Sequence, residues 1–150
     1  MDLVDLLPTI PFLTKLKPSE LDALSKALIV DTYKDGHVFI HEGQRAEGIH
    51  LVVEGDVHVG RDRKGVWHPL TSVGPGDFFG LVSMLDSRDP TATCRAEGTV
   101  VVASMIRSVF AVTFGAHAPI SIAFQHALCA QLARDFRAVD ERIKAAFAQF

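Results

Sequence analysis

The chain has 150 residues, 48% of them hydrophobic, so it can bury one core but is too short for two domains of ordinary size. Fifteen Lys and Arg against 18 Asp and Glu give a formal net charge of −3 without a basic stripe, which argues against direct nucleic-acid binding. The acidic start of the chain lacks the features of an export signal, and a cytoplasmic protein is expected.

A short helix is predicted where Pro18-Ser19-Glu20 precedes leucines spaced three and four residues apart. From residue 29 to 107 the pattern changes to short β-branched runs, and ten of the eleven glycines fall in this segment. Strands are expected over 38–40, 49–53, 57–59 and 100–102. Glu54-Gly55-Asp56 is interpreted as the tip of a hairpin between two of them. These features favour a mainly β fold with flanking helices, in the form of an antiparallel β-roll of the jelly-roll or double-stranded β-helix type.

A long C-terminal helix is predicted from Pro119 to Phe150, where glycine is absent and helix formers dominate. Polar residues interrupt its apolar stretch, so no membrane span is expected. Its apolar positions approach a heptad spacing at Leu128, Leu132, Phe136, Val139, Ile143, Ala146 and Phe150. The seam indicates a homodimer formed through Leu132, Phe136, Val139, Ile143 and Phe150. Packing of the same face on the roll of its own chain is the alternative.

Three stretches carry a resemblance to a known family: Ile10 to Leu21, Gly36 to Val57, and Gly76-Asp77-Phe78-Phe79-Gly80. In this order they resemble the cyclic nucleotide-binding domain of catabolite activator proteins and of kinase and channel regulatory proteins. The resemblance implies one domain over 1–150, with an N-terminal helical part at about 10–28. It also implies a β-roll at 29–107, a phosphate-binding cassette within it at 76–96, and C-terminal helices at 108–150. The implied protein is a regulatory domain with a cyclic nucleotide ligand and no cofactor, and it is not an enzyme.

In that family the cassette begins with Phe-Gly-Glu and closes with Arg and two small residues, and it holds the ring phosphate of the ligand. Here Leu81 stands at the glutamate position and Pro90 at the arginine position, so affinity for an ordinary cyclic nucleotide should fall by roughly two to three decades. Arg88 or Arg95 is a candidate replacement for the missing cation. The predicted ligand-binding residues are Phe79, Gly80, Leu81, Val82, Ser83, Arg88, Pro90, Thr91 and Ala92.

Three interpretations of the function follow. The first is a sensor with an atypical ligand, in which binding repositions a hinge from Arg107 to Gly115 and the terminal helix. The second is a degenerate domain that binds no nucleotide and acts as a dimerisation or docking module. The third is a metal-binding cupin enzyme, because five of the seven histidines lie between His37 and His68. No two histidines are separated by a single residue, as a cupin site requires, so no metal site and no catalytic residue is predicted.

Overall fold

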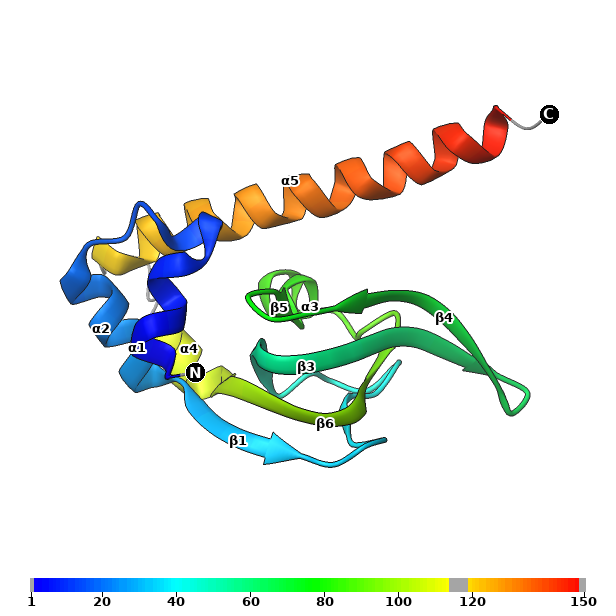
Figure 1. Ribbon diagram of the computed structural model, residues 1–150, viewed down its shortest axis with the longest axis horizontal. Helices are drawn as coiled ribbons and strands as arrows, with labels where there is room; N and C mark the ends of the chain where they lie inside the picture. The colour runs from blue at the N-terminus through cyan, green and yellow to red at the C-terminus, as the bar shows by residue number, and fades with distance from the viewer. Residues whose placement is uncertain (1, 114–118, 149–150) are drawn as a thin grey trace.

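In the computed structural model, which describes residues 2–113 and 119–148, helices from both ends of the chain flank an antiparallel sheet (Figure 1). The N-terminal helices are α1 (Leu3–Leu6), η1 (Leu7–Thr9), η2 (Pro11–Leu13) and α2 (Pro18–Ala27). The strands are β1 (Ile29–Tyr33), β2 (Val38–Ile40), β3 (Gly48–Arg63), β4 (Val66–Val73), β5 (Phe78–Phe79) and β6 (Thr93–Ile106). The later helices are α3 (Leu81–Asp86), α4 (Arg107–Thr113) and α5 (Pro119–Phe147). The predicted class, a mainly antiparallel β fold with a short N-terminal and a long C-terminal helix, is confirmed.

Helix α2 confirms the helix predicted from the proline and the leucine spacing. Pro18 occupies its first turn, and the Glu20 carboxylate accepts a hydrogen bond from the Lys17 backbone N–H at 3.0 Å. Helical structure nevertheless begins at Leu3, ahead of the expected boundary near residue 10. The additional turns form because Leu3 and Leu7 find buried positions beneath them.

The sheet has the strand order β1-β6-β3-β4, with β2 paired to β6 and β5 paired to β3. The predicted hairpin tip at residues 54–56 is wrong, because β3 runs through it and stays paired with β6. Register shifts on both sides of Glu54 absorb the irregularity as a bulge. Gly55 has φ +84, and a Cβ there would lie 2.9 Å from the Thr99 carbonyl oxygen. The actual hairpin turn is Lys64-Gly65, whose positive φ values of 55 and 77 suit the tight connection from β3 to β4.

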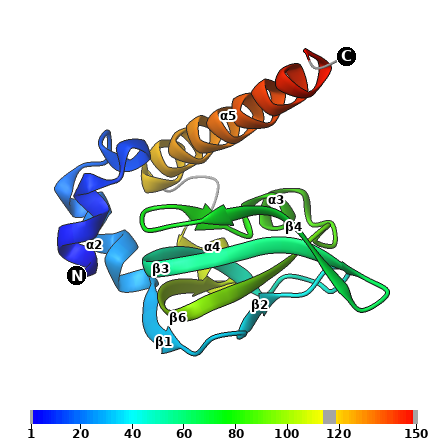
Figure 2. The same ribbon diagram turned by 45° about the vertical axis from the view of Figure 1, so that its right-hand side comes forward.

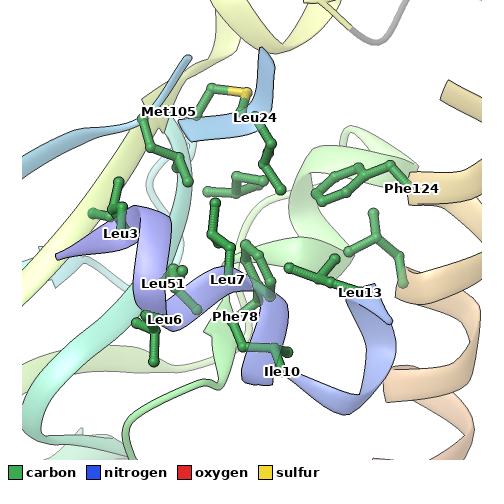
Figure 3. Close-up of a cluster of buried hydrophobic side chains, with 14 of the residues drawn as sticks. Leu3, Leu6, Leu7, Ile10, Leu13, Leu24, Leu51, Phe78, Met105 and Phe124 are labelled. Carbon is green, nitrogen blue, oxygen red and sulfur yellow. The ribbon is translucent and has the colours of Figure 1, made fainter. Parts of the chain in front are cut away.

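Two apolar clusters form the core, and the adjacent residues Phe78 and Phe79 belong to different ones. Phe78 packs between the roll and the helices, beside Leu7, Leu13 and Phe124 (Figure 3). Phe79 points into the roll itself, because successive side chains of a strand face opposite ways. The strand β5 therefore connects the interior of the roll to the helical layer.

Helix α5 begins in the core and leaves it. Phe124 and Leu128 are buried, whereas Phe136 is 72% and Ile143 49% exposed. Figures 1 and 2 both show the far half of α5 rising away from the roll. The predicted seam thus divides, since Leu128 is buried and Leu132 is half-buried within the chain, whereas Phe136, Val139 and Ile143 are exposed. Phe150 lies outside the described residues. Within residues 2–113 and 119–148, no helix is long and apolar enough to cross a bilayer.

Candidate functional site

The backbone of the predicted cassette turns sharply between β5 and α3. β5 pairs with β3 through His50 and Phe79, and Gly80 then adopts φ +81 to enter α3. A Cβ on Gly80 would lie 2.9 Å from Ile40 Cδ1 and 3.1 Å from the Gly48 carbonyl oxygen. Both the conformation and the close approach therefore require glycine at this turn.

A cavity of about 230 Å³ lies beside this turn, between the cassette, the roll and α5. Its lining residues from the predicted set are Phe79, Gly80, Leu81, Val82, Ser83, Pro90, Thr91 and Ala92. Its other lining residues are Ile40, Val59, Val73, Phe78, Cys94, Gln131, Leu132 and Asp135. Segments that are far apart in the sequence thus meet around one space. Leu81 is only 4% exposed and also belongs to the helical core cluster, so the side chain at the expected glutamate position contributes to packing.

The two candidate replacement cations do not line this cavity. The chain turns at Ser87, which has φ +57, and Arg88 is exposed on the following loop. The geometry therefore does not support Arg88 as a ligand contact. Arg95 stacks on Trp67, with its guanidinium carbon 3.8 Å from the ring centroid. Because side chains alternate along β6, Arg95 faces away from the interior into which Cys94 points.

The loop that closes the cassette is tied to the roll by its backbone. The Pro90 carbonyl accepts a hydrogen bond from the Gly43 N–H at 2.9 Å, and the Thr91 carbonyl accepts one from Arg61 Nε at 2.8 Å. Pro90, which stands where the resemblance implies an arginine, is buried and lines the cavity. These two hydrogen bonds hold the loop that contains Pro90 and Thr91, and they do so without an ion pair between an arginine of the loop and a phosphate.

Helix α5 covers the cavity and is held to the cassette by two polar contacts. Gln131 Nε2 donates to the Phe78 carbonyl at 2.9 Å, and Arg134 Nη2 donates to Asp77 Oδ1 at 2.9 Å. Partial burial raises the pKa of Asp135 above its usual range, and the Asp77 carboxylate acts in the same direction while Arg134 opposes it. Sequence reasoning missed Gln131 and Asp135. Their spacing of one helical turn was the available signal, but nothing in the sequence says that this face covers the cassette.

Buried titratable groups lie against the wall of the cavity inside the roll. The His50 ring stacks on Phe79 with centroids 4.9 Å apart, and its Nδ1 lies 2.7 Å from Ser104 Oγ. Burial, followed by the charge of His37, lowers the pKa of His50 to about 4. Burial also raises the pKa of the Cys94 thiol to about 12. Both side chains are therefore neutral near pH 7; Cys94 lines the cavity, and His50 lies behind Phe79.

Comparison with known proteins gives the class of this domain. Residues 30–116, more than half of the chain, match the family model described as the cyclic nucleotide-binding domain. The chain belongs to the cyclic nucleotide-binding domain family, and the predicted resemblance is confirmed.

Particular relatives are regulatory proteins. The cAMP-dependent protein kinase regulatory subunit of Debaryomyces hansenii is 33% identical over 111 residues, which are 74% of this chain and 24% of that protein. The chain spans about a quarter of the length of the curated relatives it matches. The catabolite activator protein of Thermus thermophilus superposes with a TM-score of 0.73 at 26% identity, over 91% of this chain and 62% of that one.

A further solved relative is the regulatory subunit of a cAMP-independent protein kinase A from Trypanosoma cruzi, bound to guanosine. It superposes with a TM-score of 0.68 at 28% identity, over 81% of this chain and 43% of that one. The relatives are regulatory subunits and an activator, which confirms the predicted regulatory class over that of an enzyme.

Proposed function

We propose that this domain is a sensor that binds a cyclic nucleotide or an atypical relative of one in the 230 Å³ cavity beside Gly80. The single observation that carries the proposal is that the cassette and α5 line the same cavity. The guanosine bound to the Trypanosoma cruzi relative extends the candidate ligand class to nucleosides. The relatives also favour a cytoplasmic site of action, as kinase regulatory subunits.

The proposed signal is a change in the position of α5. A ligand in the cavity would contact Leu132 and Gln131 directly, so binding and the position of the helix are coupled. The predicted hinge begins at Arg107, whose backbone N–H donates to the Glu47 carbonyl at 2.8 Å and whose Nη2 donates to the Ala46 carbonyl at 2.8 Å. Residues 107–113 form α4, and Gly115 lies outside the described residues. Movement of α5 on ligand binding would therefore begin after Arg107, which these two hydrogen bonds anchor.

Thermal-shift and calorimetric titrations test the sensor function. The ligands are cyclic AMP, cyclic GMP, cyclic di-GMP, adenosine and guanosine. Ala92→Phe fills the cavity, and Ala23→Phe on an exposed position of α2 is the matched control. At least one ligand should raise the melting temperature of the unchanged protein and of the control but not that of Ala92→Phe. No shift with any ligand at millimolar concentration contradicts the sensor function and leaves the degenerate docking module.

We also propose a homodimer through the outer half of α5. Phe136, Val139 and Ile143 follow one another at intervals of three and four residues, and all three are exposed. Phe150, which completes the predicted seam, lies outside the described residues. The net charge of −3 over the whole chain supports a protein partner over direct nucleic-acid contact. Sedimentation equilibrium of the unchanged protein should give a dimer, and the double variant Phe136→Ser, Ile143→Ser a folded monomer. A monomeric unchanged protein at micromolar concentration contradicts the proposal.

A further inference from the structure

The exposed apolar side chains in the outer half of α5 lie on a face turned away from the roll. Ala138 and Arg142 mark the face turned toward the roll, because they line a cavity of about 270 Å³ together with residues of β4. On a helix of 3.6 residues per turn, Phe136 and Ile143 lie roughly 140–160° around the axis from Ala138. Both are exposed, so this face is open to another chain. In heptad terms its a positions are Cys129, Phe136 and Ile143, and its d positions are Leu132, Val139 and Ala146.

The charges beside this seam disfavour a parallel pair of helices. Asp135 and Arg142 each precede an a position and are therefore g residues, whereas Asp140 follows a d position and is an e residue. In a parallel pair, each g residue meets the e residue five positions later in the partner helix, so Asp135 would face Asp140 of the second copy. A symmetric dimer would contain this like-charge contact twice. Among the residues that the structure describes, no g and e positions of α5 would form an opposite-charge pair to offset it.

An antiparallel pair removes this conflict. There g residues meet g residues, so Asp135 of each copy faces Arg142 of the other, and opposite charges meet twice. A shift of one heptad in either direction would bring Asp135 against Asp135 or Arg142 against Arg142. The charges therefore favour one direction and one register. This register places Phe136 against Val139, Leu132 against Ile143 and Cys129 against Ala146 of the other copy.

Both charged side chains are accessible to a second copy. The Asp135 side chain is 53% exposed. Gln131 and Arg134 contact its carboxylate, which has two oxygens and can accept further hydrogen bonds. Arg142 is exposed, and its Nη1 donates to the Leu70 carbonyl at 3.2 Å. A guanidinium carries five N–H donors, so the same group can also contact a carboxylate of another helix.

We propose that two copies of this chain pair in antiparallel orientation through the outer half of α5, with Asp135 of each copy beside Arg142 of the other. This inference rests on the proposed homodimer and specifies its geometry. Phe124 and Leu128 are buried and fix the roll to the first half of α5. In the antiparallel pair the two rolls therefore lie toward opposite ends of the paired helices.

Cys129 reports the orientation without an added label. It is exposed and occupies an a position, whereas Cys94 is buried. In the antiparallel dimer Cys129 faces Ala146 of the second copy, but in a parallel dimer the two Cys129 thiols face each other. Diamide accepts the two protons and two electrons that a pair of thiols loses on forming a disulfide. Treating the full chain with diamide should therefore leave the unchanged protein unlinked on a non-reducing gel and convert Ala146→Cys into a covalent dimer. Ala145→Cys, which lies beside the seam positions and outside them, is the matched control and should stay unlinked.

Reversing one charge distinguishes the two orientations by the sign of its effect. Asp135→Arg turns both attractive contacts of the antiparallel dimer into repulsive ones. The dissociation constant measured by sedimentation equilibrium under reducing conditions should therefore rise by about tenfold or more. In a parallel dimer it should fall, because the new arginine would face Asp140. Adding Arg142→Asp to Asp135→Arg should restore the dimer, which also shows that the variants fold. Glu141→Arg makes the same change of charge at an exposed position outside the seam and should alter the constant by less than about twofold.

The outcomes separate this inference from the homodimer on which it rests. If the unchanged protein is monomeric, both fail. If it is a dimer that diamide links through Cys129 alone, the antiparallel orientation is overturned and the homodimer stands. If it is a dimer and Ala146→Cys remains unlinked, the proposed register is overturned. If Asp135→Arg strengthens the dimer, or behaves as Glu141→Arg does, the pairing of Asp135 with Arg142 is overturned.

Discussion

His50 allows the packing behind the cassette to be tested by pH. The neutral ring is stacked on Phe79 and contacts Ser104, and burial lowers its pKa from 6.5 to about 4. Between these values the unfolded chain binds a proton that the folded chain does not. The stability contributed by neutral His50 is therefore complete above about pH 6.5 and is lost as the pH falls toward 4. The difference of 6.5 − 4, at about 1.36 kcal/mol per pKa unit, corresponds to about 3 kcal/mol.

Urea unfolding followed by circular dichroism measures this contribution. His50→Gln keeps a neutral polar side chain opposite Ser104 and removes the titration, so the other ionisable groups cancel in the comparison. Between about pH 7.5 and pH 4.5, the free energy of unfolding of the unchanged protein should fall relative to that of His50→Gln by about 2–3 kcal/mol. His68→Gln, at an exposed position of β4, should follow the unchanged protein. Parallel curves for the unchanged protein and His50→Gln would refute the buried placement of this ring.

Three further predictions concern packing and thiol reactivity. Gly80 and Gly36 both have positive φ, but of the two only Gly80 has a side chain within 2.9 Å of where a Cβ would lie. Gly80→Ala should therefore lower the free energy of unfolding in thermal melts by at least about 2 kcal/mol, and Gly36→Ala by about 1 kcal/mol. Equal losses would contradict the close packing of the turn. Phe124→Ala should cost about 3–5 kcal/mol in urea unfolding, since the ring is 0% exposed, and a loss under about 1 kcal/mol would exclude its core position. Cys129 is exposed and should react at once with a thiol reagent. Burial raises the pKa of Cys94 to about 12, so this thiol should react only when the protein unfolds. Fast reaction of both thiols in the folded protein would contradict the burial of Cys94.

The parts of the fold that local chemistry determines were predictable. Pro18 and the leucine spacing predicted α2, and the pair Phe79-Gly80 predicted the cassette turn. The segment around Gly55 was misinterpreted because a bulge and a hairpin tip use the same residue types. Only the pairing with β6, more than 40 residues away, decides between them.

The cassette half of the candidate site was predictable and the helix half was not. Leu81 and Pro90 lie beside the cavity, as the motif predicts, because they are close to Gly80 in the chain or joined to it by a short loop. Gln131 and Asp135 reach the cavity only through the tertiary packing of α5, which helical periodicity does not specify. Periodicity identifies an apolar face but does not say which part of the chain will cover it.

The cluster in Figure 3 joins Leu3 and Leu7, near the start of the chain, to Phe124 of α5, and this order matters during synthesis. Leu7 and Leu13 leave the ribosome about a hundred residues before Phe124 does. At about 5–20 residues per second, the nascent chain carries these leucines for about 5–20 seconds before Phe124 completes their cluster. Exposed apolar segments of this kind are prone to aggregate, so folding in the cell is expected to benefit from a chaperone that shields these leucines until α5 has been synthesised.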